Sequence, residues 1–226
     1  MAKLILLRHF KSQWNLENRF TGWVDVPLMR ADFEIPALDF DVVYTSPLIR
    51  NLHTVLKVFE KKDKYPIFRH FKGKMKNWTH FEELGPDRNN ISNGAGQNYI
   101  QVFVSEALNE RYYGKLQGLN KEETMKKYGK EKVHLWRRSY NIAPPGGESL
   151  KDVFERATPF YKKYIENDLK KGKNVLVVAS HNSLRALVKY IENISDDDII
   201  NFEIPYGGII EYDFDESFKL INKKIL

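Results

Sequence analysis

Two short apolar runs in this chain each break abruptly into ionisable residues. Residues 4–7 (LILL) have no polar face, so they predict a strand that is buried on both sides, and Arg8 and His9 follow it directly. Residues 175–179 (VLVVA) repeat the pattern, and His181 comes two positions later. Charged and polar side chains do not enter an apolar core without a partner, so the ends of these two strands are candidate functional positions.

Two further segments show apolar residues at helical spacing. Residues 41–45 predict a strand, after which Ser46 is placed as an N-cap and Pro47 at the first position of a helix, with apolar residues at helical spacing as far as Phe59. Residues 149–165 predict another amphipathic helix, which opens with the Ser and Asp of a capping box and should be kinked at its internal proline.

The remaining pattern defines the fold class. An amphipathic helix follows His181, and residues 207–222 predict a hairpin that turns through 215–217. Strands that alternate with helices predict an α/β protein of three layers, α/β/α, around a mostly parallel sheet. We expect a single domain over residues 1–226, with a polar surface insertion at about 61–98, where no periodicity is present.

Composition indicates an ordinary globular protein. The 226 residues are 42% hydrophobic and 13% aromatic, which is enough to bury a core, and the absence of cysteine excludes a disulfide scaffold and a thiolate metal site. The apolar run near the N-terminus is too short for a signal peptide or a membrane span. We therefore expect a cytoplasmic protein with no membrane partner.

The net charge of +6 is concentrated in one segment. Residues 61–76 hold seven Lys and Arg against one Asp, an excess equal to the net charge of the whole chain. The basic residues are Lys61, Lys62, Lys64, Arg69, Lys72, Lys74 and Lys76. Such a run is either a solvated loop or a patch that binds nucleic acid or another partner.

Topology should bring the strand-end residues together. In open parallel sheets, ligands bind beyond the carboxyl ends of the strands, so Arg8, His9, Arg50 and His181 should face one crevice. The arginine fork fits phosphate oxygens and repels cations, and no metal-ligand spacing occurs nearby, so we expect an anion and no metal. The other four histidines are expected to be structural.

Neighbouring positive charge should keep His9 neutral, with a nitrogen lone pair available. A neutral histidine that faces phosphorus is a nucleophile, and a phosphohistidine divides one difficult transfer into two easier ones. This chemistry also requires a separate group that protonates the leaving oxygen.

Five segments of the chain resemble the signature blocks of the 2,3-bisphosphoglycerate-dependent phosphoglycerate mutases, in the histidine phosphatase superfamily. They are LLRHFKSQWNLENRFTGWVDVPL, YTSPLIRNLHT, ALNERYYGKLQGLNKEET, WRRSYNIAPPGGESL and HNSLRALV. The resemblance implies the phosphoglycerate mutase-like fold and an isomerase of glycolysis and gluconeogenesis. This enzyme would interconvert 3-phosphoglycerate and 2-phosphoglycerate without metal, through a phosphohistidine primed by 2,3-bisphosphoglycerate.

The resemblance also implies roles for individual residues. His9 would be the nucleophile, Glu110 the general acid and base, and Arg8, Arg50 and His181 would bind the transferring phosphoryl group. The implied substrate-binding residues are Asn15, Thr21, Gly22, Tyr113, Lys121, Arg137, Arg138 and Asn182.

Four features depart from the family pattern. Phe10 stands where the family has glycine, so either the turn needs no positive φ or the loop is displaced. The glycine that follows the second histidine in the family is missing after His181, which could shift that residue by about 3.8 Å. Residues 29–40 are too short for the family's helix, which would leave an apolar sheet face to a partner subunit. The chain also ends shortly after the hairpin, and a loose lid would favour attack by water.

Two alternatives to the mutase remain open from the sequence. One is a phosphatase of the same superfamily. The other is a catalytically degraded basic binding protein that uses residues 61–76. Under the mutase hypothesis, the partners are small phosphorylated three-carbon acids, nucleic acid is not expected, and the chain forms a homodimer or homotetramer.

Overall fold

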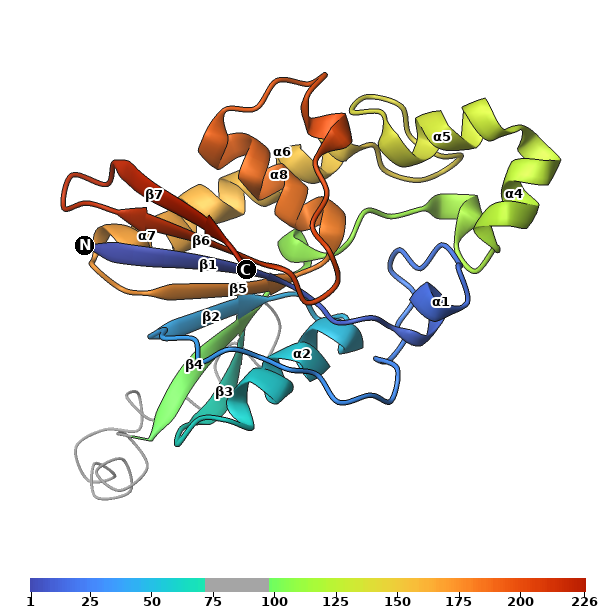
Figure 1. Cartoon of the computed structure of the whole chain (residues 1–226). Helices are drawn as coiled ribbons and strands as arrows, with labels where there is room; N and C mark the ends of the chain where they lie inside the picture. Colours follow the sequence, from blue (N-terminus) through green and yellow to red (C-terminus); the bar gives the residue numbers. More distant parts are fainter. Residues whose placement is uncertain (72–97) are drawn as a thin grey trace.

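The apolar run at the N-terminus forms β1 (Ala2–Arg8), an interior strand of a seven-stranded sheet. The computed structural model describes residues 1–71 and 98–226. Within these residues the strand order is β3-β4-β2-β5-β1-β6-β7 (Figure 1). The other strands are β2 (Val42–Thr45), β3 (Tyr65–His70), β4 (Tyr99–Val104), β5 (Val175–Ala179), β6 (Ile209–Phe214) and β7 (Leu220–Ile225).

Strands β1 to β5 pair in parallel, whereas β6 and β7 are antiparallel to their neighbours. The predicted mostly parallel sheet is therefore confirmed, as is the terminal hairpin. Because β1, β2 and β5 run in the same direction, their carboxyl ends lie at one edge of the sheet.

Helices cover both faces of the sheet, as the three-layer prediction requires (Figure 1). The α-helices are α1 (Gln13–Leu16), α2 (Ile49–Phe59), α4 (Lys121–Tyr128), α5 (Lys130–Arg138), α6 (Leu150–Phe160), α7 (Glu166–Lys170) and α8 (His181–Glu192). Short 3₁₀ turns occupy Glu106–Leu108, Gly114–Leu116 and Ile199–Asn201.

Alternate residues of β1 supply the two cores, because successive side chains of a strand point to opposite faces. Leu4 and Leu6 pack in the core shared with α6 and α8, and Ile5 and Leu7 pack in the core shared with α2. All four side chains have no exposed surface. The opening run is therefore apolar throughout because both faces of this strand are covered.

The capping box predicted for the helix at 149–165 is confirmed. Ser149 Oγ accepts from the Asp152 N–H at 3.2 Å, and Asp152 Oδ2 accepts from the Ser149 N–H at 2.7 Å. After Pro159 the helix continues through a π-helical turn, Tyr161–Ile165, into α7. The proline is thus accommodated by a wider turn directly after it.

The predicted start of the helix after β2 is wrong by two residues. α2 begins at Ile49, and its N-cap is Leu48, whose side chain makes no capping hydrogen bond. The Ile49 N–H instead donates to Asp25 Oδ1 at 2.6 Å. A cap supplied from 24 residues upstream leaves no local signal in the sequence, so the nearby Ser46 was the natural expectation.

The segment expected as a polar insertion contributes an edge strand. β3 lies within residues 61–98 and pairs with β4, and neither strand was predicted. Residues 72–97 lie outside the described residues. Of the basic residues at 61–76, Arg69 is buried in β3 and Lys61 donates to the Ile35 carbonyl at 3.2 Å. Lys72, Lys74 and Lys76 lie outside the described residues.

Residues 29–40 contain no helix, as expected, but the prediction of an uncovered sheet face is wrong. Ile35, Leu38 and Phe40 are buried against the core beneath α2. The irregular segment therefore covers this face from within the same chain. In the described part of the chain, no helix combines the length and apolarity that crossing a membrane requires.

Candidate active site

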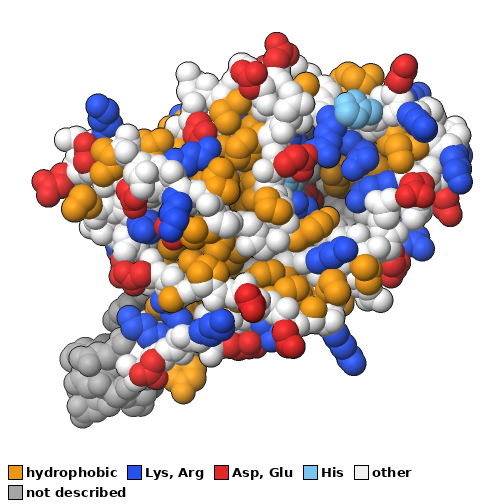
Figure 2. Space-filling view, in the orientation of Figure 1, with side chains coloured by type: hydrophobic (Ala, Val, Ile, Leu, Met, Phe, Trp, Pro, Cys, Tyr) orange, Lys and Arg blue, Asp and Glu red, His pale blue; other side chains and the backbone are white. Residues whose placement is uncertain are grey.

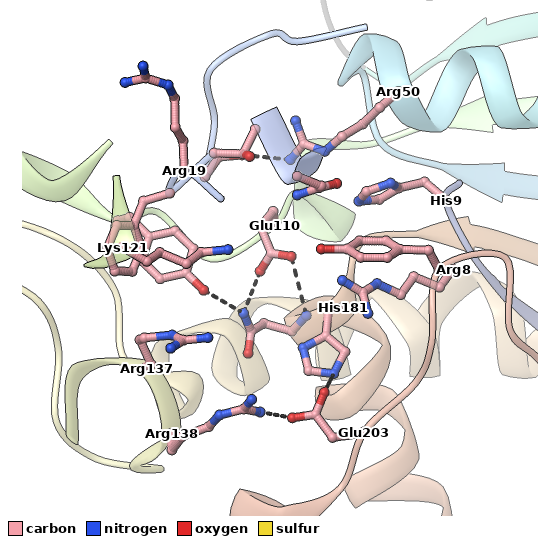
Figure 3. Close-up of a pocket in the computed structure, with 17 residues that line it drawn as sticks. Arg8, His9, Arg19, Arg50, Glu110, Lys121, Arg137, Arg138, His181 and Glu203 are labelled. Atoms are coloured by element: carbon pink, nitrogen blue, oxygen red, sulfur yellow. Dashed lines mark hydrogen bonds and ion pairs between the residues drawn. The ribbon is translucent and has the colours of Figure 1, made fainter. Parts of the chain in front are cut away.

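Every residue for which the sequence implied a catalytic or substrate-binding role lines one cavity of about 250 Å³, at the carboxyl ends of β1, β2 and β5 (Figure 3). The predicted residues present are Arg8, His9, Asn15, Thr21, Gly22, Arg50, Glu110, Tyr113, Lys121, Arg137, Arg138, His181 and Asn182. Figure 2 shows Lys and Arg side chains gathered over the region between α5 and α8. Topology thus brings together residues that are more than 170 positions apart in the sequence.

His9 follows the last residue of β1 and is 3% exposed. Its Nδ1 lies 2.6 Å from the Phe10 carbonyl oxygen, which can only accept a hydrogen bond, so Nδ1 carries the proton. In the neutral ring the lone pair is then on Nε2. Burial, reinforced by Arg50 and Arg8, lowers the pKa of His9 well below its ordinary value, which is the direction that the predicted neutral ring requires.

Arg50 lies in the first turn of α2 and is 1% exposed. Its guanidinium donates to the Gly22 carbonyl at 2.6 Å and to the Val24 carbonyl at 3.1 Å. Burial lowers the pKa of Arg50 to about 10, which leaves it charged at neutral pH. The segment between α1 and β2 therefore holds this cation in place beside His9.

Glu110 is a buried carboxylate held by several donors. Its Oε1 accepts from the Arg111 N–H at 2.7 Å and from Asn182 Nδ2 at 2.6 Å. The Asn182 N–H lies 3.5 Å from Oε2, and the indole of Trp23 donates to the Glu110 carbonyl at 2.5 Å. These contacts join the segment after β4 to the first turn of α8 and fix the carboxylate within the cavity.

A second set of cations comes from the helical pair α4 and α5. Lys121 is the first residue of α4, and Arg137 and Arg138 are the last two of α5. Burial, followed by the charges of Arg137 and Arg8, lowers the pKa of Lys121 to about 8. Three like charges at one wall favour the binding of an anion, which would relieve their mutual repulsion.

Phe10 resolves one departure from the family pattern. It does not adopt a positive φ, it is buried, and its ring stacks on Phe33 with centroids 4.3 Å apart. Gly207 faces this ring closely, because an added Cβ there would stand 2.8 Å from it. The turn after His9 therefore accommodates Phe10 without a positive φ. The room for the Phe10 ring comes from the missing side chain of Gly207 in the facing loop.

His181 reaches the cavity although the glycine after it is missing. It is the first residue of α8 and Ser180 is the N-cap, so the helix begins at His181 itself and not after it as expected. Burial and then Arg8 lower the pKa of His181 well below its ordinary value. Its Nε2 lies 3.1 Å from Glu203 Oε2.

Four further residues line the cavity that the sequence patterns did not indicate, namely Arg19, Phe20, Glu203 and Tyr206. Glu203 and Tyr206 precede β6. Because β6 is antiparallel to β1, its first residue lies at the same sheet edge as the carboxyl end of β1. The predicted hairpin therefore indicates, through the direction of its first strand, that these two residues lie near the cavity. Among residues 1–71 and 98–226, no group of three or more His, Asp or Glu could hold a metal ion.

Comparison with known proteins identifies relatives along the whole chain. Residues 4–70 and 90–224 match the model of the histidine phosphatase superfamily, branch 1. The 2,3-bisphosphoglycerate-dependent phosphoglycerate mutase of Methanococcus vannielii is 44% identical over 96% of this chain and 92% of its own length. The enzyme of the same name from Gloeothece citriformis is 40% identical, with full coverage of both chains.

Solved structures show the same fold at lower identity. Bacillus stearothermophilus YhfR matches with a TM-score of 0.69 and 22% identity over 98% of this chain and 95% of its own. A mycobacterial glucosyl-3-phosphoglycerate phosphatase matches with a TM-score of 0.66 and 18% identity over 99% and 96% of the two chains. The chain belongs to branch 1 of the histidine phosphatase superfamily and, within it, to the 2,3-bisphosphoglycerate-dependent phosphoglycerate mutase family.

Proposed function

We propose that the protein interconverts 3-phosphoglycerate and 2-phosphoglycerate through a phosphohistidine on His9. It would be an isomerase of the intramolecular phosphotransferase type, and we assign it to glycolysis and gluconeogenesis in the cytoplasm. The observation that carries the proposal is the combination of groups in one cavity. A buried neutral imidazole, a separate fixed carboxylate and two sets of cations face the same space.

The cavity fits a small polyanion. Arg8 and Arg50 stand beside His9, and Lys121, Arg137 and Arg138 form the opposite set. These side chains would hold the phosphates and carboxylate of 2,3-bisphosphoglycerate, which when bound supplies the phosphoryl group that primes His9. Among the described residues, Glu110 and Glu203 are the only carboxylates in the lining, so the cavity is suited to an anion without a bridging cation.

His9 and Glu110 divide the chemistry between them. The C2 hydroxyl of 3-phosphoglycerate attacks the phosphorus on His9 Nε2, the N–P bond breaks, and the electron pair returns to Nε2. Glu110 takes the hydroxyl proton. After the doubly phosphorylated intermediate reorients, Nε2 attacks its 3-phosphoryl group, the O–P bond breaks, and Glu110 returns the proton as 2-phosphoglycerate is released.

The residues around these two groups bind and orient the ligand. Arg8, Arg50, Asn15 and His181 bind the transferring phosphoryl group, whose charge spreads over its oxygens in the transition state. The other end of the ligand is held by Lys121, Arg137, Arg138, Tyr113, Asn182, Thr21 and Gly22. Holding both ends keeps the intermediate in the site while it turns, which a phosphatase does not need.

An isomerisation assay tests the proposal. The protein is primed with 2,3-bisphosphoglycerate and given 3-phosphoglycerate in excess chelator, and formation of 2-phosphoglycerate and release of inorganic phosphate are followed together. We expect isomerisation to exceed phosphate release, to persist with chelator and to vanish in His9→Ala. Phosphate release without isomerisation would replace the mutase with the phosphatase, and no turnover would refute both.

A further inference from the structure

Glu203 places a carboxylate inside an otherwise cationic part of the cavity. Its Oε1 forms an ion pair with Arg138 Nη1, and its Oε2 lies 3.1 Å from His181 Nε2 (Figure 3). The Glu203 side chain is 51% exposed, so it is not part of the packed core. It contacts two residues that the proposed reaction uses to bind the anionic substrate.

The contact with His181 is one that a ligand can replace. Although Nε2 is only 3.1 Å from Glu203, it has no hydrogen-bond partner among residues 1–71 and 98–226, so the carboxylate approaches without the alignment that a hydrogen bond needs. Arg138 is partly exposed on the same side. The Glu203 carboxylate is half-exposed, and its ion pair with Arg138 is partly exposed. Such a carboxylate is weakly bound, because solvent competes for both charges.

The segment that carries Glu203 is anchored at its far end. The Gly207 N–H donates to the Arg8 carbonyl at 3.1 Å, and the Arg8 N–H donates to the Gly208 carbonyl at 3.0 Å. The Tyr206 ring lies 3.8 Å from the Arg8 guanidinium, and Arg8 donates to the carbonyl of Ile204. The backbone is therefore held as close to Glu203 as Ile204, so that the Glu203 side chain can leave its partners while the segment stays fixed.

We propose that Glu203 is an internal counter-anion that a ligand's second anionic group must displace from Arg138. The inference rests on the proposed function for the identity of that ligand, but the competition of charges does not depend on it. A ligand with one anionic group can bind beside His9 and leave Glu203 in place. A ligand with two must compete with Glu203, which weakens its binding and helps the doubly phosphorylated intermediate to reorient and leave.

The test compares Glu203→Gln, which keeps the size of the side chain and removes its charge, with Glu155→Gln as a matched control. Glu155 is 62% exposed on α6, and its nearest cation, Lys151, is 3.9 Å away. Dissociation constants of 2,3-bisphosphoglycerate, tripolyphosphate and orthophosphate are measured by titration calorimetry. For E203Q we expect about threefold to tenfold tighter binding of the first two probes, and orthophosphate unchanged within about twofold.

Kinetics supply a second readout. We expect KM for 3-phosphoglycerate to fall in E203Q with no rise in kcat, because a uniformly tighter complex does not lower the barrier from the bound state. E155Q should match the parent protein in every measurement.

Two results would overturn the inference. Unchanged binding in E203Q would show that the carboxylate does not compete, and weaker binding would show that it positions Arg138 and His181 instead. Tripolyphosphate binds without any turnover, so the two proposals fail separately. Tighter tripolyphosphate binding in a protein that does not isomerise would refute the function alone, and isomerisation with unchanged binding would refute the inference alone.

Discussion

His9 owes its proposed reactivity to the different surroundings of its two ring nitrogens. The Phe10 carbonyl fixes the proton on Nδ1, and burial with two neighbouring arginines keeps the ring neutral. Neutrality could be predicted from the sequence, because Arg8 is adjacent and Arg50 follows β2, whose carboxyl end lies at the same edge of the sheet. The Nδ1 contact could not, because it depends on how the backbone turns after β1.

Glu110→Gln tests the division of labour at the residue scale. The amide keeps the shape of the carboxyl group but cannot take a proton, so kcat should fall by about 10² to 10⁴-fold, while KM changes only a few-fold. Steady-state kinetics measure both constants, and circular dichroism controls for folding. A kcat within threefold of the parent value would remove Glu110 from the proposed proton transfer.

Lys121 predicts a pH dependence of binding. Its pKa of about 8 lies below the ordinary lysine value, so the ammonium group is charged below pH 8 and loses its proton as the pH rises above it. KM for 3-phosphoglycerate should therefore rise between pH 8 and 9.5. Lys121→Arg should keep KM flat over this range, because a guanidinium stays charged. Parallel KM profiles for the two proteins would contradict this explanation.

At the scale of elements, the predicted and observed structures agree where the signal is local. The apolar runs at β1 and β5, the capping box at Ser149 and the hairpin of β6 and β7 each follow from neighbouring residues. The predicted and observed structures differ where an element depends on a residue that is distant in the sequence. Asp25 caps α2 from another loop, and β3 is stabilised by its pairing with β4, neither of which leaves a mark in the local pattern.

Phe10 and Gly207 are a distant pair of this kind, and a double-mutant cycle tests their coupling. Gly207→Ala should destabilise the fold by about 2–4 kcal/mol, from a Cβ close to the ring and from its φ of +73°. Phe10→Ala should cost about 3–5 kcal/mol through the cavity it leaves.

With both substitutions present, the loss should be smaller than the sum by about 1–3 kcal/mol, because the clash is gone while the backbone strain remains. Urea unfolding of the four proteins measures the cycle. Additive losses would show that the ring and the glycine do not constrain each other.

At the scale of the whole molecule, the sheet determines where charge accumulates. Parallel strands bring Arg8, Arg50 and His181 to one edge, and the antiparallel strand β6 returns Glu203 and Tyr206 to the same place. Sequence motifs located Arg8, Arg50 and His181. The positions of Glu203 and Tyr206 depend instead on the direction of β6. The net charge of +6 was less informative, because part of the basic segment at 61–76 is buried or bound to carbonyl groups.

This arrangement predicts that ionic strength affects substrate capture. Lys and Arg outnumber Asp and Glu in the cavity lining, so salt should screen the attraction of an anionic substrate. We expect kcat/KM to fall several-fold between about 20 and 300 mM potassium chloride, mainly through KM. A value of kcat/KM that does not change over this range would show that the cavity's charge does not guide the substrate.

The most direct test of the account is the chemical state of His9 after exposure to 2,3-bisphosphoglycerate. The protein is incubated with this compound in excess chelator, digested at alkaline pH and examined by mass spectrometry, with His9→Ala as the control. The account predicts one acid-labile phosphoryl group on His9 of the parent protein, which 3-phosphoglycerate removes, and none in the variant. Turnover with no phosphoryl group on His9, or with the group on another residue, would contradict it.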